Sequence, residues 1–278
     1  MTATDATTRR HPAVDGDGYV TIEDISFAYA AGAPRILADV SLSLSRGEFF
    51  VLLGPSGCGK TTVLNQVAGF EFPTEGRMTV AGRPVTGPGP DRAVIFQGDD
   101  SLLGWLNVYG NVEFGLRVLG VKNPERQQRV RAALEMVELG GQAKKYPHEL
   151  SGGMKQRVQI ARALVTDAPI LLMDEPFGAL DAQTRTTLQD ELARIWAATD
   201  RTVLFITHDI SEAMILGDRI GIMTSGPEAR LHDVIENPLP RPRERGGPDF
   251  GALYQDLERT VTTAKARRPG LDGEVGTR

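Results

Sequence analysis

The sequence predicts an α/β protein whose mostly parallel central sheet carries an added antiparallel β subdomain and an inserted helical subdomain. Residues 49–53, 170–173 and 203–206 are continuous apolar runs, which is typical of parallel strands buried on both faces. Over residues 20–29 and 40–44, apolar residues partly alternate with polar ones, which predicts half-buried antiparallel strands. Residues 98–165 have a helical pattern: Asn123 can cap one helix with Pro124 in its first turn, and Ser151 can begin another.

The two ends of the chain differ from this core in composition. Residues 1–18 are polar and lack the apolar segment of a signal peptide, so we expect a disordered N-terminal tail before a main domain at 19–235. Residues 236–278 are expected to form a Pro/Arg-rich linker, a short amphipathic helix and a disordered C-terminal tail.

Bulk composition narrows the possible classes of function. A net charge of −5 lacks the basic footprint of a nucleic-acid-binding protein, so we expect no nucleic-acid partner. Cys58 is the single cysteine, which excludes an internal disulfide and fits a reducing compartment. The sequence contains no apolar run of about 18 residues, the length that indicates a transmembrane helix, and we expect no membrane span.

The segment after the first apolar run matches the phosphate-binding pattern G-x-x-x-x-G-K-[ST]. Glycines let its backbone curl so that successive N–H groups point at phosphate oxygens, and the next helix presents its positive end to the same anion. Lys60 is expected to reach the β- and γ-phosphates, and the Thr61 hydroxyl to bind Mg²⁺. A chance match is the alternative, and the position between a buried strand and a helix argues against it. The predicted ATP-binding residues here are Gly54, Pro55, Ser56, Gly57, Cys58, Gly59, Lys60, Thr61 and Thr62.

Two acidic residues end the second apolar run. Asp174 stands where a carboxylate can hold magnesium, usually through water. Glu175 comes next and can orient or deprotonate an attacking water. An apolar run ending in Asp-Glu carries little weight alone, and it gains weight from the phosphate loop earlier in the chain. We therefore predict a metal ligand at Asp174 and a catalytic base at Glu175.

A third anion-binding element is Ser151-Gly152-Gly153, which opens a helix. Without the other motifs it would be a simple helix cap. With them, the segment resembles the LSGGQ signature of ABC ATPases, with Met154 in place of the usual glutamine. The resemblance covers residues 19–235 and implies a P-loop NTPase core with the two subdomains predicted above.

The same resemblance assigns roles to residues elsewhere in the chain. Tyr29 matches the aromatic residue that stacks on adenine, and Gln97 matches the Q-loop glutamine that contacts the metal and the water. Asp181 lies in a segment resembling the D-loop, and His208 matches the H-loop histidine that contacts the γ-phosphate. A lone tyrosine is more often packing and a lone histidine more often structural, but six motifs in the family's order favour function. The predicted catalytic residues are thus Glu175, His208, Gln97 and Lys60, and the predicted metal ligands are Thr61, Gln97 and Asp174.

The resemblance also implies an assembly. In ABC ATPases two subunits pair head to tail, and each ATP lies between the phosphate loop of one and the Ser-Gly-Gly of the other. We therefore expect a homodimer that binds two ATP with Mg²⁺, with Ser151 and the Gly153 amide on the γ-phosphate across the interface. The resemblance also implies two transmembrane permease subunits and a periplasmic or lipoprotein substrate-binding protein as partners. It implies a location at the cytoplasmic face of the cell membrane.

Finer similarity indicates importers of the nitrate, sulfonate and taurine group. Residues 87–92, 174–181 and 240–243 fit that group, and residues 102–105 resemble its Leu-Leu-Pro-Trp with Gly104 replacing proline. In this family the segment after Gln97 forms the groove that receives a helix of the membrane subunit. Trp105 is then either an interface residue or ordinary packing in the lobe.

Three alternatives stay open. The chain can serve another permease, for a different nutrient or a lipid. A soluble nucleic-acid-associated ABC ATPase would carry coiled coils, zinc modules or two cassettes, none of which the sequence contains. A regulatory module without turnover is disfavoured by the intact Glu175 and His208. The position of Cys58 further predicts that alkylation blocks ATP hydrolysis and that bound ATP protects the thiol.

Overall fold

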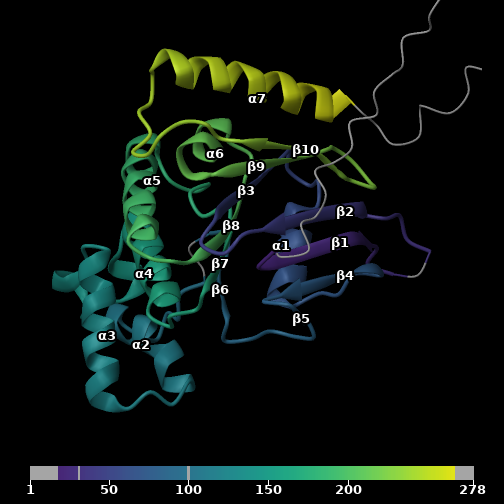
Figure 1. Cartoon of the computed structure of the whole chain (residues 1–278). Coiled ribbons are helices and arrows are strands. Elements are labelled where there is room, and N and C mark those ends of the chain that lie inside the picture. The colour runs from purple at the N-terminus through teal and green to yellow at the C-terminus, as the bar shows by residue number, and fades with distance from the viewer. Residues whose placement is uncertain (1–17, 31, 99–100, 267–278) are drawn as a thin grey trace, which may run out of the picture.

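A computed structural model describes residues 18–30, 32–98 and 101–266 and shows two sheets with helices packed around them (Figure 1). The larger sheet has six strands, in spatial order β10 (Leu231–Glu236), β9 (Arg219–Met223), β3 (Phe49–Leu53), β8 (Thr202–Thr207), β7 (Ile170–Asp174) and β6 (Arg92–Ile95). Only the β9–β10 pair in this sheet is antiparallel. Strands β3, β7 and β8 are buried along their whole length, so the predicted parallel core is confirmed.

The smaller sheet is antiparallel and has the order β2 (Leu37–Leu44), β1 (Val20–Phe27), β4 (Glu75–Val80) and β5 (Arg83–Pro84). The predicted antiparallel subdomain is therefore confirmed. Strand β1 is more buried than the half-buried strand expected. It lies between β2 and β4, and its apolar side chains share one core with β3 and the first helix.

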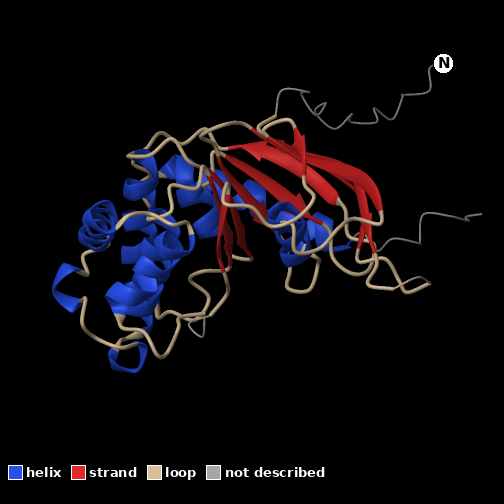
Figure 2. Ribbon diagram, turned by 90° about the horizontal axis from the view of Figure 1, so that it is seen from below, coloured by secondary structure: helices blue, strands red, loops and turns tan. Residues whose placement is uncertain are grey.

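The helices lie in two places relative to these sheets. Helix α1 (Lys60–Ala68) packs between the sheets. Helices α2 (Val108–Val118), α3 (Asn123–Met136) and α4 (Gly152–Leu164) form a lobe at one side of the molecule, away from the antiparallel sheet (Figures 1 and 2). Helix α3 begins at Asn123, one residue earlier than predicted, and Lys122 rather than Asn123 is the cap. Short 3-10 turns at Gly140–Gln142 and Pro147–Glu149 connect α3 to α4.

The remaining helices cover the face of the large sheet opposite α1. Helix α5 (Ala182–Ala197) and helix α6 (Ile210–Leu216) pack there in the same core as the lobe. The C-terminal helix α7 (Pro248–Ala266) lies across α6 and β9 (Figure 1) and buries Leu257, Val261 and Ala264. It has 19 residues, which is longer than the short helix expected.

The linker expected at residues 238–248 ends one residue earlier, because α7 begins at Pro248, and its arginine side chains form hydrogen bonds with the core. None of the helices that the structure describes is long and apolar enough to span a membrane. Residues 1–17 of the N-terminal tail predicted at 1–18 lie outside the described residues, as do residues 267–278 of the predicted C-terminal tail and positions 99 and 100 in the segment after Gln97.

Candidate functional site

The predicted phosphate loop connects β3 to α1 at the carboxyl edge of the large sheet. Gly57 and Gly59 have φ values of 78° and 87°, a left-handed conformation that glycine adopts without a steric penalty. A Cβ atom on Gly59 would also lie 2.6 Å from Leu37 Cδ2. Helix α1 has no side-chain cap at its first turn, so its first N–H groups face the loop as an anion-binding end.

Lys60 is held in the centre of this loop. Its Nζ donates hydrogen bonds to the carbonyl oxygens of Gly54 at 2.8 Å and Pro55 at 3.0 Å. The side chain is only 4% exposed, and Nζ lies 3.6 Å from Glu175 Oε1. The loop thus fixes a buried ammonium group next to the carboxylate predicted to be the base.

Thr61 and Asp174 lie side by side, as the prediction of a magnesium site requires. Thr61 Oγ1 donates a hydrogen bond of 3.2 Å to Asp174 Oδ1. Burial raises the pKa of the Asp174 carboxyl, an effect opposed by this hydrogen bond and by Lys60. No three His, Cys, Asp or Glu side chains gather into a metal cage anywhere in the described residues. A hydroxyl and one carboxylate nevertheless fit Mg²⁺, which usually keeps several waters and binds substrate phosphates.

Glu175 follows one strand, and its side chain contacts the residue that follows the neighbouring strand. It follows β7, and its Oε2 lies 3.0 Å from Nδ1 of His208, the residue that follows β8. The Glu175 side chain is 14% exposed and that of His208 is 53% exposed, so the histidine is the outer member of the pair. Glu175 has a φ of 40°, an unfavourable value for a residue with a side chain, and such strain concentrates at functional sites.

A hollow of about 340 Å³ collects most of the predicted nucleotide residues. Tyr29 stands on its rim, 67% exposed, with its ring edge-on to Phe27 at 5.0 Å. Ile36 also lines the hollow; it could not be identified from the sequence, because an apolar residue before a strand carries no chemical signal. The predicted residues in the lining are Tyr29, Ser56, Gly57, Gly59, Lys60, Thr61, Thr62, Gln97 and Glu175.

The predicted signature and D-loop residues lie outside this hollow. Ser151 caps α4, and its Oγ accepts a hydrogen bond of 3.3 Å from the N–H of Met154. Asp181 caps α5 in the same way, by accepting from the N–H groups of residues 183 and 184, and these bonds lower the pKa of its carboxyl. The two helix starts adjoin each other, since a Cβ on Gly153 would lie 2.6 Å from Thr184 Cγ2. Ser151 and Gly152 are exposed.

Cys58 differs from the other loop residues. It is 1% exposed and belongs to the apolar core beneath the loop, and it does not line the hollow. Burial raises the pKa of its thiol, with a smaller opposing effect of Lys60. Its side chain therefore lies beneath the loop, whereas the alkylation prediction placed it beside the phosphates.

Two polar side chains of α4 hold the loop that contains Gln97. Gln159 Nε2 donates to the carbonyl of Gly98 at 2.8 Å, and Arg162 donates to the carbonyl of Ser101 at 2.7 Å. Burial lowers the pKa of Arg162. Neither residue was identified from the sequence, because a polar side chain on a helix is indistinguishable from a solvated one until its neighbours are known.

Comparison with known proteins identifies the family. A family model described as ABC transporter matches residues 37–178, which contain the phosphate loop, Ser151 and Glu175. The chain belongs to the ABC transporter family. As a member of the ATP-binding subunits of this family, it is an ATPase coupled to transmembrane transport.

Curated relatives of this ABC protein are import and transport subunits. A nitrate import ATP-binding protein of Synechococcus elongatus is 49% identical over 251 residues, covering 90% of this chain and 91% of the relative. A taurine import ATP-binding protein of Chromobacterium violaceum is 47% identical over 239 residues, covering 86% and 90%. A bicarbonate transport ATP-binding protein of Synechocystis sp. is 46% identical over 231 residues, covering 82% of each chain.

A solved structure is similar as well. The dimeric post-hydrolysis structure of the ATP-binding cassette MJ0796, bound to ADP and Pi, superposes with a TM-score of 0.67 at 30% identity. The match covers 78% of this chain and 98% of that one. The fold class predicted from the sequence is therefore that of ABC cassettes.

Proposed function

We propose that two copies of this ABC protein bind two ATP with Mg²⁺ between them and drive two permease subunits that import a sulfonate such as taurine, or nitrate. In this proposal residues 19–235 are the ATPase domain, with residues 98–165 as its helical subdomain. The subunit works at the cytoplasmic face of the membrane and, with the permease, receives solute from a periplasmic or lipoprotein binding protein. A permease for another nutrient or a lipid is the alternative.

One observation carries the hydrolytic part of the proposal. The carboxylate of Glu175 lies between Lys60 Nζ, 3.6 Å from Oε1, and His208 Nδ1, 3.0 Å from Oε2. A carboxylate at the mouth of a phosphate loop can orient or deprotonate water that attacks the γ-phosphate. Lys60 and His208 would hold that phosphate, and Tyr29 would stack on the base.

Magnesium supplies charge neutralisation at the phosphates in this scheme. Thr61 and Asp174 are its proposed ligands on the chain, with Gln97 reaching the metal or the water from the adjoining loop. The rest of its coordination would come from water and phosphate oxygens.

The dimeric part of the proposal is supported by the position of Ser151. Its helix end is exposed and outside the hollow that contains Lys60, so one chain presents two separate anion-binding ends. A head-to-tail pair brings the two ends together on one ATP. The γ-phosphate then holds the interface closed, and its loss favours opening, which is how hydrolysis becomes motion.

The permease is proposed to dock near the loop after Gln97. Trp105 is 75% exposed, and Phe70 and Phe96 form an exposed stacked pair at 6.0 Å. Exposed aromatic residues are enriched at protein interfaces.

The test is reconstitution with candidate permease pairs and their binding proteins. We expect ATP turnover that rises when taurine, another sulfonate or nitrate is added, and that is lost in the Glu175→Gln variant. Bicarbonate belongs in the same panel because a bicarbonate transport subunit is comparably similar. Turnover stimulated by bicarbonate alone, or by none of these solutes, would reject the proposed substrate group while leaving the ATPase assignment in place.

A further inference from the structure

The chain between β10 and α7 carries an unexpected set of contacts. We call residues 237–245 the arginine strap. Its side chains occupy the C-terminal end of α6, where the last carbonyl groups of any helix lack partners within the helix. Asn237 Nδ2 donates at 2.8 and 2.9 Å, Arg243 donates at 3.1 Å, and Arg241 also donates there. The accepting carbonyls belong to Met214, Gly217, Ile215 and Leu216.

The other end of α6 adjoins His208. The hydroxyl of Thr207 accepts a hydrogen bond of 3.0 Å from the N–H of Asp209 and donates one of 2.6 Å to Glu212 Oε2. One side chain thus connects the residues on both sides of His208 to the first turns of α6. Thr207 is 1% exposed and Glu212 is 5% exposed, so water does not compete for these bonds.

A side chain of α5 connects the two ends. Gln189 Nε2 donates to Glu212 Oε1 at 3.1 Å, and Gln189 Oε1 accepts from Arg245 of the strap at 2.9 Å. Arg245 also donates to Asp190 at 2.9 Å. A continuous line of hydrogen bonds therefore runs from the strap through Gln189 and Glu212 to Thr207.

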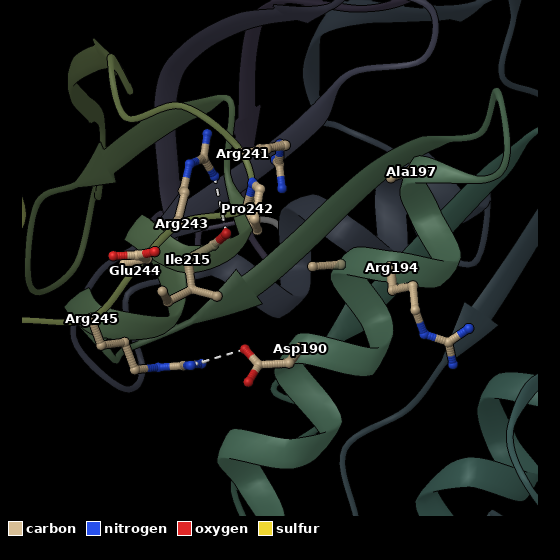
Figure 3. A pocket seen from close by; sticks show the side chains of 10 residues that line it. Asp190, Arg194, Ala197, Ile215, Arg241, Pro242, Arg243, Glu244 and Arg245 are labelled. Atoms are coloured by element: carbon tan, nitrogen blue, oxygen red, sulfur yellow. Dashed lines mark hydrogen bonds and ion pairs between the residues drawn. The ribbon is translucent and has the colours of Figure 1, made fainter.

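The strap could instead bind an anion in the hollow beside it, but the geometry disfavours this role. The hollow has a volume of about 780 Å³, and several arginine side chains line it, so it could be taken for an anion site. Figure 3 shows Arg245 directed at Asp190 and Arg243 at the carbonyl of Ile215. Arg241 pairs with Asp218 and stacks over Trp196 at 4.4 Å. An anion would have to displace these partners from the arginines. A strap held in place by its arginines is consistent with all of these contacts.

We propose that Thr207, Glu212 and the arginine strap are positioning residues that hold His208 against Glu175 for ATP hydrolysis. The inference rests on the proposed role of His208. The strap fixes α6 at its C-terminal end, and the Thr207–Glu212 bond fixes the backbone on which the imidazole stands. Because His208 is half exposed, few contacts of its own ring can do so.

The test compares two substitutions at one position. Thr207→Val keeps the size and the β-branch but removes the hydroxyl, whereas Thr207→Ser keeps the hydroxyl and serves as the matched control. We expect Val to lower kcat by about tenfold or more, since small displacements of a reacting group have large effects. KM for ATP should change by less than about twofold, because the proposed contacts of Lys60 and Tyr29 with the nucleotide remain. The Ser variant should retain the parent kcat.

A double variant shows whether Thr207 acts through His208. In the His208→Ala background, Thr207→Val should have no further effect, as expected for residues that act as one unit. Arg245→Met should lower kcat by about threefold without changing KM, and Arg259→Met, on the exposed face of α7, should change neither. These readouts also separate positioning from simple loss of stability, which the melting temperature of each variant reports.

The turnover of these variants tests the proposed role of Thr207 separately from the proposed role of His208. Parent-like turnover in Thr207→Val beside an inactive His208→Ala would overturn the inference alone. Losses that multiply in the double variant would overturn it too, because they mean independent roles. Parent-like turnover in His208→Ala would reject the proposed role of His208 and the inference with it.

Discussion

The two anion-binding helix ends of this protein differ in how complete they are. The end of α1 is surrounded by its own chain: Lys60 is 4% exposed and lies among two carbonyls and the Glu175 carboxylate. The end of α4 is open: Ser151 is exposed, and its hydroxyl accepts a hydrogen bond of 3.3 Å from the Met154 N–H of its own helix. In the proposed dimer, the first end is a site within one subunit, and the second end contributes to the site of the other subunit. The variants below test that contrast.

The largest effect on turnover is expected at the site that contains Lys60 and Glu175. Glu175→Gln keeps the shape of the side chain but removes the base, so turnover should fall by about 10²–10⁴-fold while ATP still binds. ATP should then accumulate a closed dimer, which size-exclusion chromatography with and without MgATP would detect. Near-parent phosphate release by this variant would remove Glu175 from its assigned role.

Lys60→Ala tests binding at the same end. Removing a buried ammonium that reaches the phosphates should weaken ATP binding by about 10–100-fold, the range expected for a charged hydrogen bond. Titration with a fluorescent ATP analogue would measure this change. Thr187→Ala, on the exposed surface of α5, is a control expected to leave affinity unchanged.

Ser151→Ala tests the open end and sharpens the contrast. Because Ser151 is proposed to contact nucleotide only across the dimer, the variant should bind ATP like the parent as a monomer. Its ATP-dependent dimerisation should weaken by about 100-fold, because the variant dimer loses two hydrogen bonds to charged groups, each worth about tenfold. Analytical ultracentrifugation with the Glu175→Gln variant as background would report both quantities. Weaker binding by the isolated monomer would place Ser151 in its own chain's site.

The smallest effect is expected at Cys58. The thiol is 1% exposed and burial raises its pKa, so less of it is thiolate at neutral pH than in an ordinary cysteine, and labelling should be slow even without ATP. The rate of alkylation should rise as the pH approaches the raised pKa of the Cys58 thiol. Unfolding should expose the thiol and make labelling fast. Mass spectrometry of alkylated protein at two pH values, native and unfolded, would measure this. Fast labelling of the native protein at neutral pH would show that the thiol is accessible, as the prediction of alkylation blocked by bound ATP requires.

Features that depend on neighbouring residues in the sequence were predictable, whereas features that depend on packing between distant elements were not. The phosphate loop, Asp174 and the capping role of Ser151 were predicted because each depends on neighbouring residues. The 19-residue length of α7 was not predicted, since its boundaries depend on packing against α6 and β9. The strap was predicted only as a linker, because a Pro/Arg-rich composition does not show whether the arginines face solvent or a helix end.

The sequence by itself determined where strands β1, β2, β3, β7 and β8 lie and which backbone segments can bind phosphate. Apolar runs and glycine positions act over a few residues, and their physics is local. The tertiary structure alone decided that Glu175 lies between Lys60 and His208 and that the strap reaches Thr207 through Gln189. Those contacts join side chains from separate elements, and their geometry exists only after the sheet and helices have packed.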